Sequence, residues 1–197
     1  MPLPHPLDLP DPGSYDAVIF DCDGTLADTM PVHYQAWCAA LGPNATFFPE
    51  PVFYSLGGVP TVRIVELLNE QHGLTLPPDH TVDIKEKLFL QMCSHVEPIE
   101  EVVAFADALR GKKPISVASG GHRHVVHQTL RSIRVFEWFE HIITAEDYHR
   151  GKPHPDPFLV AAQRMGVPPD RCLVFEDSVT GLDAARAANM LSVFVPA

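Results

Sequence analysis

The stretch Asp21-Cys22-Asp23-Gly24-Thr25-Leu26-Ala27-Asp28 decides how the rest of this chain is interpreted. It follows the apolar run 17–20, which predicts a short buried strand. Gly24 and Thr25 interrupt the strand pattern, so two carboxylates lie where a strand ends and a loop begins. A spacing of two residues points both side chains to the same side of an extended backbone. Such a pair repels unless a cation or a proton neutralises it, which favours a divalent metal or nucleophilic carboxylate chemistry.

The same residues, taken alone, also suit an ordinary turn, because Asp, Gly and Thr are common turn residues. A calcium-binding loop does not fit, since Thr25 breaks that pattern and the required Glu does not follow. The choice between a turn and a site therefore depends on the rest of the chain.

Length and composition limit the class of protein. The 197 residues suffice for one domain with an insertion, or for two modest domains. A formal net charge of −11 argues against nucleic acids and anionic membranes as partners. The Pro-rich segment 1–13 is typical of a tail and not of a signal peptide. Four scattered cysteines without a C-x-x-C spacing indicate buried thiols in a reducing cytoplasm.

Strand and helix patterns alternate along most of the chain. Strands are predicted over 17–20, 114–118, 141–144, 172–175 and 191–195. Helices are predicted over 100–110, 122–132, 156–165 and 179–188, and also over 31–41, 61–72 and 79–94. Alternation of this kind predicts an α/β fold, a Rossmann-like parallel sheet with helices on both faces. The domains follow as a core over 14–29 and 97–197, with a small all-helical cap, 30–96, inserted after the first strand.

Polar side chains collect at the carboxyl ends of the predicted strands, where α/β proteins bind their ligands. Asp21 and Asp23 follow the first strand, and Ser119 follows the second. Lys152 opens the helix after the third strand, and Glu176-Asp177 follows the fourth. Alone, each of the later groups has an ordinary explanation: a loop with a helix cap, a solvated lysine and a capping pair of acids. Together they supply what phosphoryl transfer requires.

Each group suits one role in that chemistry. Asp21 is the candidate nucleophile, forming an aspartyl-phosphate, and Asp23 is the candidate general acid and base. Ser119 would donate to the phosphoryl oxygens, and Lys152 would neutralise their charge. A Mg²⁺ site is predicted from four carboxylates, Asp21, Asp23, Glu176 and Asp177.

These motifs resemble those of the haloacid dehalogenase-like superfamily. The resemblance rests on Asp21–Asp28, Ser119, the segment 152–158 and the segment 175–185, and covers nearly the whole chain from Tyr15. Within the superfamily, the second aspartate of the first motif implies phosphoryl transfer and not dehalogenation. The predicted cap resembles that of the β-phosphoglucomutase-like subfamily. Segments 96–98 and 163–166 resemble sugar phosphatases of fructose-1-phosphatase type.

The resemblance also implies substrate contacts, at His33, Gly58, Arg63 and Gly120. Pro60 and Thr61 intervene before Arg63, where the mutases typically have their arginine close behind the Gly-Val of this loop. Contacts of the mutase kind are therefore not expected here. A zinc site at His122, His124 and His127 is an alternative for those residues, although 122 and 124 cannot share a helix face.

The sequence thus predicts a cytoplasmic, monomeric, Mg²⁺-dependent phosphatase of small sugar phosphates. One alternative is a sugar phosphomutase of the same fold, in which a sugar hydroxyl replaces water as the acceptor. A second alternative is a catalytically silent relative that binds phosphorylated ligands.

Overall fold

A five-stranded parallel sheet forms the centre of the computed structural model, which describes residues 7–57 and 59–196. The strands are β1 (Ala17–Phe20), β4 (Ile115–Ala118), β5 (His141–Ile143), β6 (Cys172–Glu176) and β7 (Leu191–Phe194). Their order is β5-β4-β1-β6-β7, and every adjacent pair is parallel. All five predicted strands are present, with ends that differ by at most one residue. The predicted α/β fold class is confirmed.

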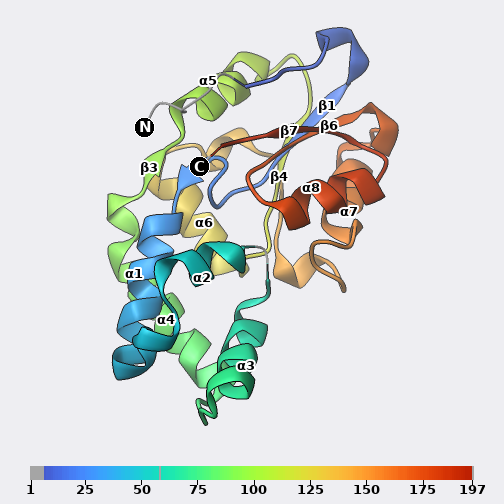
Figure 1. The fold of residues 1–197 in the computed structure, drawn as a ribbon. Helices are drawn as coiled ribbons and strands as arrows, with labels where there is room; N and C mark the ends of the chain where they lie inside the picture. The colour runs from blue at the N-terminus through green and yellow to red at the C-terminus, as the bar shows by residue number, and fades with distance from the viewer. Residues whose placement is uncertain (1–6, 58, 197) are drawn as a thin grey trace.

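Helices cover both faces of the sheet because its strands are apolar on both sides. The helices of this part are α5 (Glu100–Leu109), α6 (Arg123–Ser132), α7 (Asp156–Met165) and α8 (Val179–Ala187). Along β1, Val18 and Phe20 pack into the cluster that includes α5 and α6. Ala17 and Ile19 face the opposite way, into the cluster formed with α7 and α8. Figure 1 shows α7 and α8 together on one side of the sheet.

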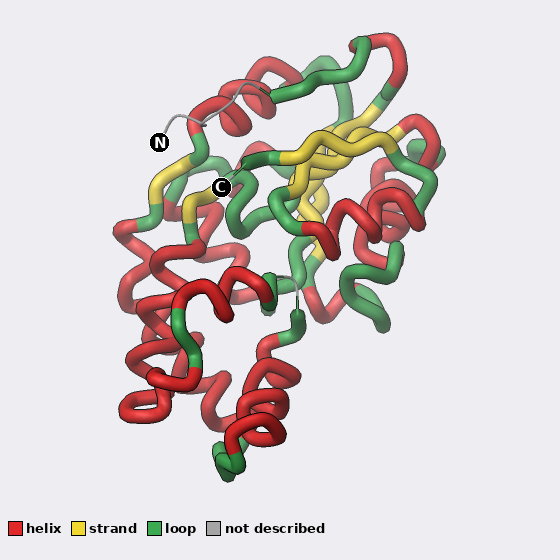
Figure 2. The backbone as a smooth tube through the Cα atoms, viewed as in Figure 1, coloured by secondary structure: helices red, strands yellow, loops and turns green. Residues whose placement is uncertain are grey.

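The chain between β1 and α5 adds a second, helical part, which we call the cap. It contains α1 (Met30–Leu41), α2 (Glu50–Ser55), α3 (Thr61–His72) and α4 (Pro78–Met92). Figure 2 shows helices and loops over the described residues of this part. The cap has its own hydrophobic cluster, made by Trp37, Leu41, Phe48, Phe53, Ile64, Val65, Leu68 and Val82. Three of these four helices follow the predicted pattern, and α2 was not predicted.

Two short strands mark where the chain enters and leaves the cap. β2 (Ala27–Asp28) pairs antiparallel with β3 (Glu97–Pro98). The N–H of Ile99 also donates to the carbonyl of Leu26 at 3.0 Å. The two connections between cap and core therefore run side by side and are hydrogen-bonded to each other. The domain boundaries proposed from the sequence, at 29/30 and 96/97, remain a prediction.

Short 3₁₀ turns connect the larger elements: Pro12–Ser14, Gly42–Phe47, Cys93–His95, Phe136–Trp138, Ala145–Asp147 and Pro169–Arg171. The first of them ties the end of the predicted tail to the core. Lys113 donates to the carbonyl of Pro12 at 2.8 Å, and Arg171 donates to that of Gly13 at 3.0 Å. Residues 1–6 of the tail lie outside the described part of the chain.

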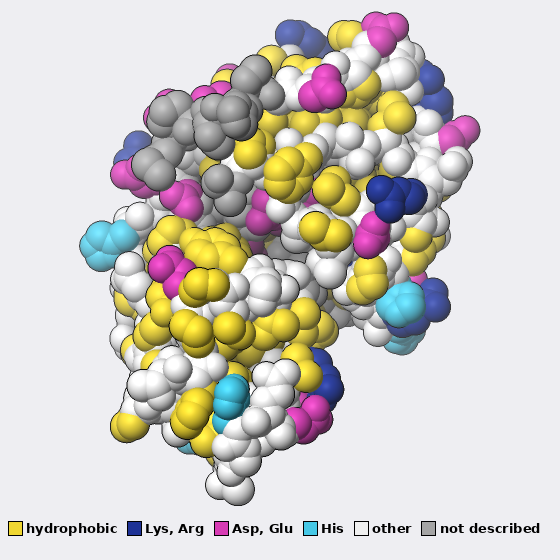
Figure 3. All heavy atoms as spheres, viewed as in Figure 1, with side chains coloured by type: hydrophobic (Ala, Val, Ile, Leu, Met, Phe, Trp, Pro, Cys, Tyr) yellow, Lys and Arg dark blue, Asp and Glu magenta, His cyan; other side chains and the backbone are white. Residues whose placement is uncertain are grey.

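The surface is hollowed between the sheet and the cap in the space-filling view (Figure 3). Within the described residues, every helix is too short or too polar to span a membrane. The four cysteines are free thiols, and all except Cys38 are buried.

Candidate active site

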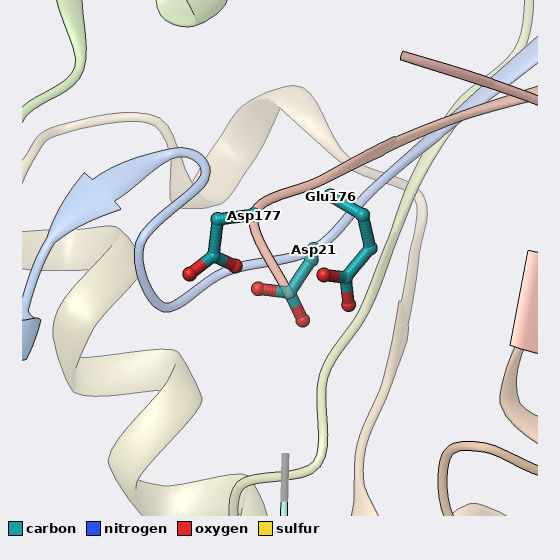
Figure 4. A group of neighbouring side chains, drawn as sticks. All are labelled: Asp21, Glu176 and Asp177. Atoms are coloured by element: carbon teal, nitrogen blue, oxygen red, sulfur yellow. The ribbon is translucent and has the colours of Figure 1, made fainter. Parts of the chain in front are cut away.

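Three carboxylates converge where β1 and β6 end. The two strands are adjacent and parallel, with Phe20 opposite Phe175, so the residues that follow them meet at one sheet edge. The N–H of Asp21 continues the ladder by donating to the carbonyl of Phe175 at 3.0 Å. Asp21, Glu176 and Asp177 each offer an oxygen within 4.8 Å of the others. Figure 4 shows Asp21 between Glu176, the last residue of β6, and Asp177, which follows it.

Lys152 joins two of these acids. Its Nζ donates to Oδ1 of Asp21 at 2.6 Å and to Oε1 of Glu176 at 2.5 Å. The Lys152 side chain is only 5% exposed, so these bonds form where water screens little. Burial lowers the pKa of the lysine, but the two carboxylates outweigh burial and raise it. Lys152 is therefore a fixed positive charge beside the candidate nucleophile.

The remaining acid, Asp177, accepts a hydrogen bond from the hydroxyl of Thr25 at 3.3 Å and forms no ion pair with the described residues. Burial raises the pKa of Asp177 to about 7, and the charge of Glu176 adds to that rise. Burial also raises the pKa of Asp21, against the opposing charge of Lys152. One lysine thus faces three acids, and a divalent cation with oxygen ligands would relieve the excess negative charge.

Two glycines allow these acids to pack so closely. Gly24 has φ +80°, and a Cβ there would collide with the carboxylate of Asp177. A Cβ on Gly181, in the first turn of α8, would overlap the carboxyl group of Glu176. Glu176 instead accepts from the N–H of Ser178 at 2.7 Å and from its hydroxyl at 2.9 Å. Both Glu176 oxygens are therefore occupied, one by Lys152 and the other by Ser178.

Asp23 points to the cap and not to the acid cluster. Its Oδ1 lies 3.2 Å from Nε2 of His33 on α1, and Lys85 of α4 lies 2.9 Å from Nδ1 of the same ring. An ammonium group can only donate, so Nδ1 accepts and Nε2–H donates to Asp23. Burial alone would raise the pKa of Asp23, but the hydrogen bond and charge of His33 lower it to about 2. Burial lowers the pKa of Lys85 to about 8.

Ser119 lies on the other side of Asp23. Its Oγ is 3.5 Å from Oδ2 of Asp23 and accepts from the N–H of Gly121 at 3.0 Å. Tyr148 supports the loop by donating its hydroxyl to the carbonyl of Ser119 at 3.1 Å. Beyond its two chain neighbours, a Cβ on Gly120 would meet no heavy atom of the described residues within 4 Å, which leaves room for a ligand beside the loop.

All these groups line one cavity of about 340 Å³ between core and cap. Its core side carries Asp21, Asp23, Ser119, Gly120, Lys152, Glu176 and Asp177. Its cap side is mostly apolar, with Trp37, Phe53 and Leu56, and carries His33, Lys85 and Glu86 as its charged or titratable groups among the described residues. A cavity with polar groups on its core side and mostly apolar groups on its cap side suits a small, partly charged ligand.

Two predicted site residues, Arg63 and Asp23, have their side chains engaged by other protein groups, and a third, Gly58, lies outside the described residues. Arg63 is directed away from the cavity, because its guanidinium binds Glu66 at 3.0 Å and Glu70 at 2.8 Å on the same helix. Arg63 does not line the cavity in this arrangement of the cap, and its contact with substrate stays a prediction. Asp23 does not belong to the metal-ligating group, since its carboxylate is turned to His33 and Ser119. Gly58 lies outside the described residues, while its neighbours Gly57 and Val59 line the cavity.

Sequence reasoning missed two charged residues of the site, Lys85 and Glu86. Both are buried, at 4% and 9% exposure. The signal was present: Val82, Lys85 and Phe89 recur at helical spacing on one face of α4, so the lysine falls among apolar residues that face inward. Of the three histidines offered as a zinc site, His122 and His124 both face Glu86, with ring centroids 6.2 Å apart, whereas His127 lies apart with its ring packed on Phe136.

Known proteins are similar to this chain in sequence and fold. A family model described as haloacid dehalogenase-like hydrolase matches residues 15–189. The chain belongs to the haloacid dehalogenase-like hydrolase family. The family resemblance inferred from the sequence motifs is thus confirmed.

Relatives of this hydrolase include the fructose-1-phosphate phosphatase YqaB of Escherichia coli, which is 35% identical over 92% of this chain and 96% of its own length. A solved HAD family hydrolase from Deinococcus radiodurans, with bound phosphate and sodium, is 33% identical with a TM-score of 0.69, covering 91% of this chain and 80% of its own. The β-phosphoglucomutase of Clostridium difficile shares the fold, with a TM-score of 0.74 at 22% identity over 90% of this chain and 83% of its own.

Proposed function

We propose that this hydrolase is a Mg²⁺-dependent phosphatase of small sugar phosphates that works through a phosphorylated Asp21. One observation carries the proposal: Asp21, Asp23, Lys152 and Asp177, from separate segments of the chain, line a single cavity. Phosphoryl transfer needs a nucleophile, a general acid and base, and fixed positive charge around the phosphoryl oxygens. This cavity has a residue for each of these needs.

The first half of the reaction transfers the phosphoryl group to the enzyme. A carboxylate oxygen of Asp21 attacks phosphorus, and the bond from phosphorus to the sugar oxygen breaks. Asp23 gives a proton to the departing sugar oxygen. The hydrogen bonds from Lys85 through His33 connect Asp23 to a buried ammonium group that can supply this proton.

The second half returns the enzyme to its starting state. Asp23, again a carboxylate, takes a proton from water as that water attacks phosphorus of the aspartyl-phosphate, and the proton passes back through His33 to Lys85. Inorganic phosphate leaves and the Asp21 carboxylate is restored. The low pKa of Asp23 in this arrangement, about 2, keeps its side chain in the carboxylate form, which is the form that can accept a proton. Lys152 and Ser119 hold the phosphoryl oxygens in both halves.

The acid cluster fits a magnesium ion, because its donors are carboxylate oxygens and its negative charge exceeds the positive charge of Lys152. Asp21 and Asp177 would hold the ion, because Glu176 is the most engaged of the three acids, with hydrogen bonds from Lys152 and from the N–H and hydroxyl of Ser178. When bound, the ion would neutralise charge on the phosphoryl group and on the attacking carboxylate. Glu176 then serves to position Lys152.

The relatives support a small phosphorylated sugar as substrate, because one of them is named as a fructose-1-phosphate phosphatase. A cavity of about 340 Å³ also suits a ligand of that size. The expected monomeric state and cytoplasmic location stand as predictions from the sequence.

A phosphate-release screen over hexose and pentose phosphates tests the proposal, with Mg²⁺ or with EDTA. We expect release that requires Mg²⁺ and is abolished in Asp21→Asn. Release that persists in that variant would refute Asp21 as the nucleophile. The mutase alternative predicts glucose 6-phosphate without free phosphate from β-glucose 1-phosphate and a trace of the bisphosphate. A silent ligand-binding protein would release no phosphate from any compound, an aryl phosphate included.

A further inference from the structure

Glu86 is a buried acid of the cavity that the proposed chemistry does not use. It lies on cap helix α4, and its side chain is 11% exposed. It lines the cavity, and its charge reaches both His33 and Lys85, whose pKa values it raises. A carboxylate is costly to bury without a partner, so the groups around Glu86 determine what it can bind.

The partners of Glu86 lie across the boundary, on the core. Nδ1 of His122 is 2.7 Å from Oε1, and Nε2 of His124 is 3.5 Å from Oε2. The first contact is a short hydrogen bond and the second is at the limit of one. A carboxylate can accept about four hydrogen bonds. Glu86 therefore retains free acceptor capacity toward the cavity, while His122 fixes its orientation.

The position of Glu86 determines which part of a substrate it can meet. The groups that hold the phosphate, Asp21, Ser119 and Lys152, all come from strand ends and loops of the core. Glu86 comes from the opposite wall, so it faces the part of the substrate away from phosphorus. The rest of that wall is largely apolar, which leaves Glu86 as its one acidic acceptor among the described residues.

The cations of the described cavity are already engaged. Lys152 binds Asp21 and Glu176, and Lys85 binds His33. Arg63, the cap arginine expected to bind substrate, binds Glu66 and Glu70 instead. Among the described residues, a second phosphate on the substrate would meet the negative charge of Glu86, and the neighbouring ammonium of Lys85 is already directed to His33.

We propose, resting on the phosphatase function above, that Glu86 is a specificity-determining residue. It accepts hydrogen bonds from hydroxyl groups of a sugar or polyol that carries a single phosphate, and it rejects substrates with a second phosphate at the far end. Because His122 of the core orients it, this contact is complete only when cap and core meet. The same residue thus selects the substrate and favours the one-phosphate reaction of a phosphatase over a bisphosphate-dependent mutase.

The test compares three substrates on two matched variants. Glu86→Gln removes the charge and keeps the shape, and Asp83→Asn makes the same change at an exposed position of the same helix. The substrates are fructose 1-phosphate, fructose 1,6-bisphosphate and 4-nitrophenyl phosphate, which lacks sugar hydroxyls. Steady-state phosphate release gives kcat/KM for each combination of enzyme and substrate, and thermal unfolding checks that each variant is folded.

For Glu86→Gln we expect kcat/KM on fructose 1-phosphate to fall about tenfold, because the substrate hydroxyls then meet a neutral acceptor in place of a charged one. Activity on 4-nitrophenyl phosphate should change less than about twofold, and the preference for one phosphate over two should shrink about tenfold. Asp83→Asn should match the wild type on all three.

An equal loss on all three substrates would overturn the proposal, because it would show that Glu86 only holds the cap closed. His122→Ala checks this alternative, since a simple latch predicts that it also lowers all three activities equally. An unchanged preference in a folded Glu86→Gln enzyme would likewise overturn the proposal. Failure of the wild type to release phosphate from any of the three would instead refute the proposed function itself.

Discussion

Replacing Lys152 by methionine removes one charge from the most buried part of the site, and its cost can be worked from the structure. The lysine makes two short charge-assisted hydrogen bonds, 2.6 Å to Asp21 and 2.5 Å to Glu176. Those carboxylates are only 8% and 1% exposed, so water cannot replace the lost partner. Breaking a buried ion pair in this way costs about 3–5 kcal/mol, a large fraction of the stability of a typical domain.

Urea unfolding of the metal-free protein measures that cost. Arg186→Met is the matched control, because Arg186 pairs with Asp183 on the surface with 80% of its side chain exposed, and we expect no measurable change there. The deficit of Lys152→Met should be larger at pH 8 than at pH 5. The orphaned carboxylates take up protons in acid and are then cheaper to bury.

A second substitution separates charge from packing. Adding Glu176→Gln to Lys152→Met removes one of the two unpaired charges and should recover part of the lost stability. A deficit below about 1 kcal/mol, or one that is the same at pH 5 and pH 8, would refute the reasoning, because it would mean that Asp21 and Glu176 do not depend on the lysine charge.

Three further outcomes follow from the site. A glycine-to-alanine change stabilises most helices, but Gly181→Ala should destabilise this protein by more than about 1 kcal/mol and lower its activity. The reason is that the new Cβ overlaps the Glu176 carboxyl group. A raised Tm would contradict this expectation. The pKa of Asp177 is raised from 3.8 to about 7 without metal, so the folded state holds more protons than the unfolded state in that interval. The free energy of unfolding in EDTA should therefore fall as pH rises from 5 to 8, and Mg²⁺ should stabilise the protein more at pH 8 than at pH 5. Thermal unfolding that shows the opposite dependence on pH would argue against a cation at Asp177. Lys85→Met should lower kcat by about ten- to a hundredfold with little change in KM, because His33 loses the donor at Nδ1. An unchanged rate constant in single-turnover experiments would exclude the proton route to Asp23.

The core of the fold could be predicted from sequence because its signals are local. Each strand is a short apolar run bounded by turn residues, and the alternation with helices fixes a parallel sheet. The acids that follow two of these strands had to meet once the strands became neighbours, as Asp21 and Glu176 do. The convergence at the sheet edge was therefore implicit in the pattern.

The cap was less predictable for physical reasons that differ by element. α2 is six residues long with a proline at its start, too short for a periodic signal. β2 and β3 have two residues each, and their pairing depends on bringing together segments about seventy residues apart. Arg63 has Glu66 and Glu70 at spacings of three and seven, so the helix itself offers its partners, and the family resemblance outweighed that local signal.

Charged residues inside the site were the hardest to find. Lys85 and Glu86 look like the solvated face of an amphipathic helix until α4 packs against the core. The helical spacing of Val82, Lys85 and Phe89 places Lys85 on the inward face of α4, but nothing within that helix indicates that Glu86 beside it is also buried.

The pairing of β2 with β3 has an evolutionary consequence. Because the chain enters and leaves the cap at adjacent, hydrogen-bonded points, everything between them forms one continuous cassette. A single exchange of that cassette would replace α1–α4, with the donors and acceptors they present to substrate, and leave Asp21, Lys152 and Asp177 untouched. Inherited diversity of substrates can then accumulate in one uninterrupted stretch of gene while the machinery for cleaving the phosphate bond stays constant.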